Sequence, residues 1–155
     1  MYISREKGNN DSGRDHMKVK DIMTQSVVKI DAEEPVDVAA RTLAHYNIGA
    51  LPVCDRKGRL CGIVTDRDIV TRCLAAGMEP VKTKVGQVMT GSVKTIDTNA
   101  DAAEAARIMG SCQIRRLPVT EDGKICGILS LGDLSENQAA GSALNRISKN
   151  RSDRN

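Results

Sequence analysis

Apolar and polar positions follow one another along this chain in a pattern that occurs twice. Runs of β-branched residues predict short strands at Val27–Ile30 and Val93–Ile96. After each run, apolar residues recur at three-to-four spacing, which predicts amphipathic helices over Pro35–Tyr46 and Ala100–Ser111. A short helical turn is expected before each strand, at Val19–Met23 and Val85–Met89.

Each copy then continues with a hairpin and closes with a helix. A glycine in each turn, Gly58 or Gly123, supplies the positive φ that tight hairpins require. The closing helices are expected from Asp66 to about Ala76 and from Leu131 to about Gln138, and Pro80–Lys84 links the copies. The four hairpin strands are predicted at Ala50–Cys54, Leu60–Thr65, Arg116–Thr120 and Ile125–Ser130. The order of elements is therefore β-α-β-β-α, used twice.

The repeat sets the predicted organisation of the chain. The copies are offset by 66 residues at Val53 and Val119, and by 65 residues from Gly58 and Gly123 onwards. A unit of this length is short for an independent domain, so each copy is expected to need the other to close its core. We predict an α/β (α+β) fold of two pseudo-symmetric units packed through their sheets. The expected boundaries are a disordered polar leader 1–16, repeats 17–80 and 81–138, and a segment 139–155 with a short helix (Ala143–Ile147) and a basic tail.

Composition narrows the possible functions. The chain has 155 residues, a net charge of +3, two tyrosines and neither Phe nor Trp. Single-stranded nucleic acid is usually bound by stacking bases on aromatic side chains, so a nucleic-acid partner is not expected. There is no apolar run long enough to span a membrane and no apolar core in the first residues that would mark a signal peptide, which predicts a cytoplasmic protein.

The residues suited to catalysis, metal binding or redox chemistry form no convincing group. The five cysteines include no CxxC pair, and Cys61 and Cys126 occupy matching positions in apolar runs, which favours small core residues. Cys54 and Cys61 flank a turn, so a redox or metal role for that pair stays open as an alternative. His45 has no nucleophile or metal ligand at a suitable spacing, and no phosphate-binding glycine loop is present. No enzyme activity is expected.

The most informative local motif is GIVTDRD at 62–68, which returns as GILSLGD at 127–133. A hydroxyl residue, Thr65 or Ser130, ends a strand, and Asp68 or Asp133 follows in the first turn of a helix. One interpretation is a nucleotide site, in which the helix start and hydroxyl hold phosphate and the carboxylate accepts ribose hydroxyls. The other is a capping box that satisfies the backbone N–H groups of the helix without any ligand. The two roles can coexist.

The copies differ at one position suited to anions. Arg115-Arg116 precedes the second Leu-Pro-Val segment, where the first copy has Gly49-Ala50. Two guanidinium groups at the start of a strand are well suited to phosphate, although exposed arginines on a solvated edge are the alternative. If ligands bind, the two sites should be unequal.

Together, the repeated [IV]MT, LPV, CGI and [TS]-x-x-D segments resemble the CBS domain family over about residues 17–138. The layout is similar to stand-alone bacterial proteins that consist of little more than one CBS pair. The resemblance implies a Bateman module that binds an adenosine-containing ligand such as AMP, ATP or NAD between its copies. It assigns ribose to Asp68 and Asp133, and phosphate to Thr65, Arg67, Arg115, Arg116 and Ser130. The adenine would lie near Val28, Ile48, Ala50, Leu51, Pro52, Ile114, Leu117 and Pro118.

The resemblance also sets the functional expectation. It implies a regulatory adenine-nucleotide sensor without catalysis or catalytic cofactor, acting as a homodimer or through an unknown protein partner. The alternatives are a ligand-independent dimerisation scaffold and, less favoured, a nucleic-acid-responsive or redox-responsive element.

Overall fold

The computed structural model describes residues 17–137. The predicted leader 1–16, the predicted helix Ala143–Ile147 and the basic tail lie outside the described residues. Within that range, no helix has the length and apolar character needed to cross a bilayer. The cytoplasmic location stays a prediction from the sequence.

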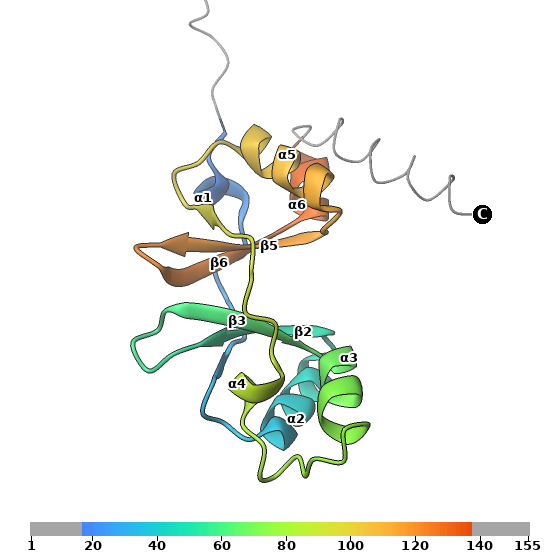
Figure 1. The fold of residues 1–155 in the computed structure, drawn as a ribbon. Helices are drawn as coiled ribbons and strands as arrows, with labels where there is room; N and C mark the ends of the chain where they lie inside the picture. The colour runs from blue at the N-terminus through green and yellow to red at the C-terminus, as the bar shows by residue number, and fades with distance from the viewer. Residues whose placement is uncertain (1–16, 138–155) are drawn as a thin grey trace, which may run out of the picture.

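Two units of similar build stack with their sheets toward each other and their helices at the outer ends (Figure 1). In each unit the middle strand pairs in parallel with a two-residue strand and antiparallel with its hairpin partner. The first unit contains β1 (Ile30–Asp31), α2 (Val36–Tyr46), β2 (Ala50–Cys54), β3 (Leu60–Thr65), α3 (Asp66–Asp68) and the π-helix η1 (Ile69–Leu74). The second contains β4 (Ile96–Asp97), α5 (Ala102–Cys112), β5 (Arg116–Glu121), β6 (Lys124–Ser130) and α6 (Leu131–Glu136). The predicted pair of β-α-β-β-α units is confirmed.

The short helical turns are exchanged between the units. Helix α1 (Val19–Ile22) comes first in the chain, yet Val19 is fully buried in the core of the second unit. Helix α4 (Val85–Val88) follows the linker, and both its terminal valines lie in the core of the first unit. Each core is thus completed by a segment that the sequence repeat assigns to the other copy, which makes the units interdependent.

Backbone pairing fixes each exchanged segment to the neighbouring hairpin. Thr24 and Ile128 exchange N–H···O bonds of 2.9 and 3.0 Å, and Thr90 and Ile63 exchange bonds of 2.8 and 2.9 Å. Two glycines allow this approach: a Cβ on Gly62 would lie 2.8 Å from the Thr90 carbonyl oxygen, and one on Gly127 would lie 3.1 Å from that of Thr24. Both distances are tighter than ordinary van der Waals contact, so the absence of a side chain lets the segments seat.

The helix periodicity read from the sequence identifies the buried faces. Val36, Ala39 and Leu43 of α2 are buried, as are Ala105 and Met109 of α5. These residues pack on β2 and β3 in the first unit and on β5 and β6 in the second, and form one aliphatic core in each unit.

Two local predictions need correction. The strands expected at Val27–Ile30 and Val93–Ile96 are only two residues long and start at Ile30 and Ile96, because β-branched residues favour an extended backbone whether or not a strand lies beside it. The helix expected from Asp66 to about Ala76 changes to a π-helix at Ile69 and ends at Leu74. Six residues make less than two turns of either helix type, so the apolar pattern of this segment does not distinguish them.

Candidate functional site

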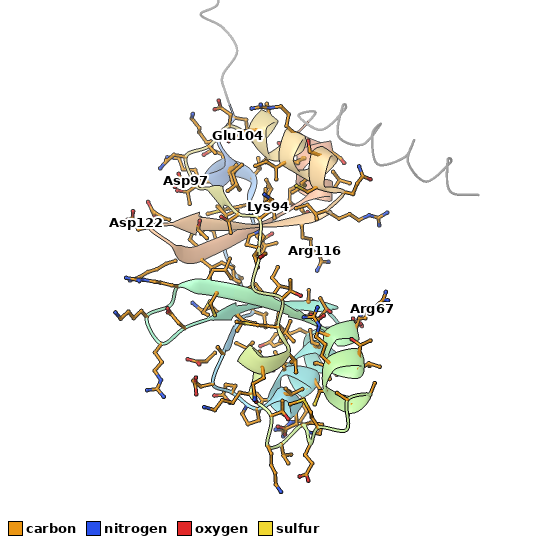
Figure 2. All side chains as sticks on the ribbon, in the orientation of Figure 1. Arg67, Lys94, Asp97, Glu104, Arg116 and Asp122 are labelled. Carbon is orange, nitrogen blue, oxygen red and sulfur yellow. The ribbon has the colours of Figure 1, made fainter. Side chains whose placement is uncertain are left out.

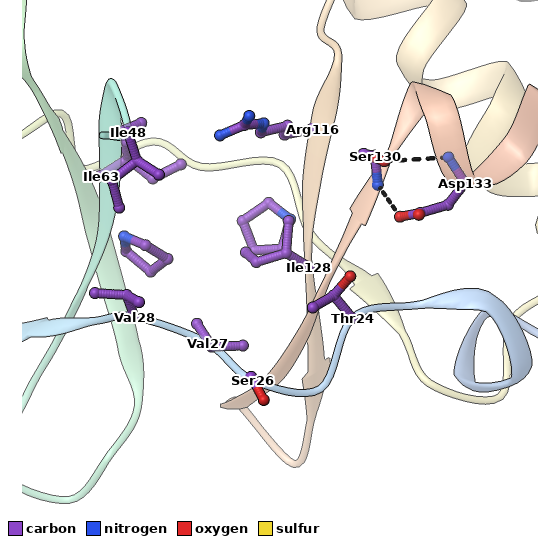
Figure 3. Close-up of a pocket in the computed structure, with 13 residues that line it drawn as sticks. Thr24, Ser26, Val27, Val28, Ile48, Ile63, Arg116, Ile128, Ser130 and Asp133 are labelled. Atoms are coloured by element: carbon purple, nitrogen blue, oxygen red, sulfur yellow. Dashed lines mark hydrogen bonds between the residues drawn. The ribbon is translucent and has the colours of Figure 1, made fainter. Parts of the chain in front are cut away.

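A cavity of about 370 Å³ opens between the two units on one side of the stacked sheets (Figure 3). One wall is apolar and comes mostly from the first unit and the segment that leads into it. The other wall is contributed by β5, β6 and the start of α6. The lining residues are Thr24, Ser26, Val27, Val28, Ile48, Ala50, Pro52, Ile63, Arg116, Pro118, Ile128, Ser130 and Asp133. Cavities of this size, apolar with a few polar groups at one side, are typical of small-molecule sites.

Asp133 and Ser130 form the polar side of the cavity. The Ser130 backbone N–H donates to Asp133 Oδ2 at 2.8 Å, and the Asp133 N–H donates to Ser130 Oγ at 3.1 Å. This is the capping box expected from the motif, and it locks both side chains at the start of α6. Asp133 Oδ1 has no partner among the residues that the structure describes, so it is available to a hydroxyl donor in the cavity.

Arg116 supplies positive charge to the same site. It pairs with Ser130 across β5 and β6, so both residues stand at the same level of the sheet. Figure 3 shows its side chain extending from β5 across the cavity toward Ile48 and Ile63. Arg116 has no ion pair within the described part of the chain, which leaves its guanidinium free for an anionic group.

The first copy of the motif forms the same capping box in different surroundings. Thr65 N–H donates to Asp68 Oδ2 at 3.0 Å, and Asp68 N–H donates to Thr65 Oγ1 at 3.1 Å. Asp68 is buried, and its Oδ1 lies 3.8 Å from Arg72 Nη1. Neither Thr65 nor Asp68 lines the cavity. The capping box is therefore present at both motifs, and only the second motif also faces the cavity.

The structure brings five residues predicted for the adenine to the cavity wall: Val28, Ile48, Ala50, Pro52 and Pro118. It places the other three elsewhere. Leu51 and Leu117 have no exposed side-chain surface and belong to the cores, because alternate residues of a strand point to opposite faces. Ile114 packs against the second core rather than into the cavity.

Of the residues predicted for phosphate, Ser130 and Arg116 line the cavity, whereas Arg115 and Arg67 do not. Arg115 is exposed, and its carbonyl accepts the Leu131 N–H at the start of α6. Arg67 is also exposed, and Figure 2 shows it and Arg116 projecting from opposite units on the same side of the molecule.

Sequence reasoning missed five lining residues: Thr24, Ser26, Val27, Ile63 and Ile128. Figure 3 shows the first three along the segment that crosses from α1 to the first unit beside the cavity. A signal was present, since Thr24 and Ser26 recur as Thr90 and Ser92 outside any predicted element. The exchange of α1 between units is what gives those positions access to the cavity.

The thiols in the sheets are held in their protonated form. Cys61 and Cys126 donate to the carbonyls of Val53 and Val119 at 3.3 and 3.4 Å, each within its own hairpin. Burial raises the pKa of Cys61 and Cys126, and the acidic side chains nearby raise it further. Burial also raises the pKa of Cys54. Within residues 17–137, no group of three or more His, Cys, Asp or Glu side chains is arranged to hold a metal ion.

Comparison with known proteins agrees with this architecture. A family model described as CBS domain matches the chain twice, at residues 19–75 and 85–140. The chain is 41% identical to the uncharacterized protein YlbB of Bacillus subtilis over 137 residues, which cover 85% of this chain and 92% of that protein. It is 39% identical to the CBS domain-containing protein YhcV of the same organism over 134 residues, which cover 84% of this chain and 94% of that one.

Solved structures show the same fold. The structure of Hypoxic Response Protein I with two coordinated zinc ions matches with a TM-score of 0.70 and 34% identity, over 77% of this chain and 98% of that one. CBSX2 in complex with AMP matches with a TM-score of 0.67 and 30% identity, over 78% and 95%. The CBS domain pair of protein MJ0100, with 5-methylthioadenosine and S-adenosyl-L-methionine, matches with a TM-score of 0.65 and 29% identity, over 79% and 95%. With two family matches that span most of its length, this chain belongs to the CBS domain family and contains a CBS pair.

Proposed function

We propose that this protein is a regulatory module that binds an adenosine-containing ligand in the cavity beside Asp133 and has no catalysis of its own. The single observation that carries the proposal is the pairing of an apolar wall from one unit with a free carboxylate oxygen and a free guanidinium from the other. An adenosine ligand offers the matching groups: an apolar base, a ribose with hydroxyl donors and, in AMP, a phosphate. Two related CBS pairs have been solved with such ligands, AMP in one and methylthioadenosine with S-adenosylmethionine in the other.

Different residues of the cavity contact different parts of the ligand. The Asp133 carboxylate accepts hydrogen bonds from the ribose hydroxyls, and the bonds to Ser130 keep its position fixed before the ligand arrives. Arg116 pairs with phosphate. The adenine packs between Val28 and Ile48 on one side and Pro118 on the other, so aliphatic contact replaces aromatic stacking in a chain without Phe or Trp.

The lining comes from both units, so a bound ligand links them. A ligand that contacts both walls stabilises the arrangement in which the walls are at the right separation, and shifts the population toward it. A second copy of the chain or another protein that binds this arrangement preferentially would then bind more tightly when the ligand is present. AMP, ATP and NAD are the ligands to compare.

The competing function is a dimerisation scaffold that needs no ligand. One observation favours it: both capping boxes are complete in the protein itself, so neither motif needs a ligand to satisfy its backbone N–H groups. The two functions predict different responses to AMP.

Calorimetric titration with AMP tests the proposal, with Asp133→Asn as the diagnostic variant. Asparagine keeps the size of the side chain but loses the charge, so the affinity should fall by at least about tenfold, the loss of one charge-assisted hydrogen bond. Asp68→Asn is the matched control and should leave the affinity unchanged. No heat and no rise in melting temperature with AMP, ATP or NAD would favour the scaffold. An equal loss in both variants would place the ligand elsewhere.

A further inference from the structure

An arginine occupies the position in the first copy that corresponds to the polar side of the cavity. Arg72 Nη1 lies 3.1 Å from the Val88 carbonyl oxygen, 3.2 Å from that of Met89 and 3.2 Å from Thr90 Oγ1. The same nitrogen is 3.8 Å from Asp68 Oδ1, in an ion pair between residues one helical turn apart. One guanidinium therefore connects the carboxylate of the first motif to the segment exchanged from the second copy.

The groups that Arg72 connects are the counterparts of two groups in the cavity. Asp68 matches Asp133, and Thr90 matches Thr24. Asp133 and Thr24 both line the cavity, whereas Asp68 and Thr90 are joined through Arg72. The carboxylate oxygen that is free in the second motif thus faces a cation in the first.

The corresponding residue in the second copy cannot make this connection. Arg72 matches Asn137, whose Nδ2 donates to the Asp133 backbone carbonyl at 2.7 Å. Its short side chain donates to its own helix and leaves Asp133 Oδ1 and the hydroxyl of Thr24 without a side-chain partner among the described residues. The difference between the two sites therefore depends on the length and charge of one side chain.

The groups that hold Arg72 in place include two backbone carbonyl oxygens, which accept hydrogen bonds from its guanidinium. The carbonyls of Val88 and Met89 end the short helix α4, where backbone oxygens lack partners within the helix. A cation that donates to them is favoured there. A phosphate, itself an acceptor, cannot replace Arg72 at these oxygens. Two backbone carbonyls and a carboxylate thus hold the guanidinium where a ribose would have to approach Asp68.

We propose that Arg72 closes the Asp68 site to adenosine ligands, so that the chain takes a single ligand, at Asp133. This inference rests on the proposed function, because it concerns the second of two related sites for the same ligand. The rival role for Arg72 is to hold a ligand phosphate in an open second site. The two roles predict opposite effects when Arg72 is removed: opening of a site in one case, and weaker binding in the other.

The test is the number of AMP molecules bound per chain in calorimetric titration, with Arg72→Asn as the variant because asparagine is the residue at the matching position. The wild-type chain should bind one AMP and Arg72→Asn should bind two. A gain of anion binding on removal of a cation cannot come from general charge attraction, so it would identify Arg72 as a block. Wild-type binding of two AMP, or one AMP in both proteins, would overturn the inference.

A second variant tests the same point if Arg72→Asn fails to fold. Asp133→Asn with Arg72 intact should bind AMP only at the weakened Asp133 site, at least about tenfold below wild-type affinity, because the Asp68 site is closed. A site of undiminished affinity in this variant, or two AMP bound per chain, would overturn the inference. The two proposals can fail separately. A wild-type chain that binds nothing, with one AMP bound by Arg72→Asn, would refute the site at Asp133 and uphold the block. If neither protein binds AMP, both proposals fail.

Discussion

The Asp133 and Asp68 sites share their local structure and differ in their surroundings. Each aspartate closes a capping box with the hydroxyl residue three positions earlier, with bonds of 3.0 and 3.1 Å at Asp68 and of 2.8 and 3.1 Å at Asp133. Beyond that box, Asp133 opens onto a cavity with Arg116 opposite Ser130, whereas Asp68 faces Arg72 and has Ala50 opposite Thr65. The duplication has therefore kept the hydrogen bonds that start the helix and varied the groups around them.

The difference teaches that the fold and the ligand site place separate demands on the same motif. A capping box contributes to the stability of each unit, so both copies retain it. Positions such as 50, 72, 116 and 137, which are exposed or half-buried and belong to neither core, contribute little to packing and are free to differ. Under the proposed function, these positions decide how many ligands the chain binds.

The largest effect is expected on the free energy of unfolding, from substitutions that displace the exchanged segments. Both units contain such a segment, so the two should respond alike. Gly127→Ala places a methyl group against Met23 and the Thr24 carbonyl, and overpacking of this kind costs about 2 kcal/mol in the free energy of unfolding. Gly62→Ala should cost a similar amount, since its new methyl group would meet Met89 and the Thr90 carbonyl. Urea denaturation followed by circular dichroism measures both.

Gly91→Ala is the control for these substitutions, because a Cβ at this position meets nothing within 4 Å. The free energy of unfolding of this variant should equal that of the wild type. Only Gly127→Ala displaces a segment that lines the cavity, so it alone should also weaken AMP binding by the folded protein. Equal stability of all three variants would show that the exchanged segments are not seated as described.

A smaller effect is expected from the charge that separates the sites. Arg116→Ala introduces the residue found at the matching position of the first copy, and should weaken AMP binding by about tenfold through loss of one charge-assisted pair. Binding of adenosine, which has no phosphate, should not change. Calorimetry with the two ligands separates these outcomes.

Arg115→Ala is the matched control, since this neighbouring arginine carries the same charge but does not line the cavity. An equal loss from both substitutions would mean that Arg116 acts through general attraction, which salt would screen. Equal loss of AMP and adenosine would mean that it does not contact the phosphate.

The smallest expected effect concerns the cysteines, where the copies should behave alike. Cys112 is exposed, whereas burial raises the pKa of Cys61 and Cys126, so less of the reactive thiolate is present at neutral pH. Alkylation followed by mass spectrometry should label Cys112 first and the other two slowly, at comparable rates. Raising the pH should accelerate the slow pair, because it increases their thiolate fraction. Rapid labelling of Cys61 at neutral pH would instead revive the redox alternative for the first copy.

Much of the fold could be predicted because it depends on local patterns. The three-to-four spacing in α2 and α5 and the glycine-containing turns gave these elements their positions to within about two residues, as expected for strong periodic signals. The strand expected at Val27–Ile30 was mostly wrong, since pairing depends on a neighbour distant in sequence, here Val53 opposite Ile30. That unpaired stretch instead supplies Val27 and Val28 to the cavity.

The candidate site could be predicted only in part, for a related reason. Asp133, Ser130 and Arg116 carry chemical signals that the sequence shows directly, in a motif and in a difference between copies. Thr24 and Ser26 show only that they recur in the second copy, which does not indicate a ligand site, and they reach the cavity only because α1 packs with the other unit. Arg72 was not singled out, because its partners Val88, Met89 and Thr90 follow it by 16 to 18 positions.

The sequence by itself determined the duplication, the order of elements, the buried helix faces and the two capping boxes, because these depend on the spacing of residues close together in the chain. The tertiary structure decided which copy completes which core, where the cavity lies and which aspartate is open. Those outcomes depend on contacts between distant segments, and local periodicity contains no information about them. The two aspartates occur in the same motif, and only their neighbours in space make one a candidate ligand site and the other the partner of Arg72.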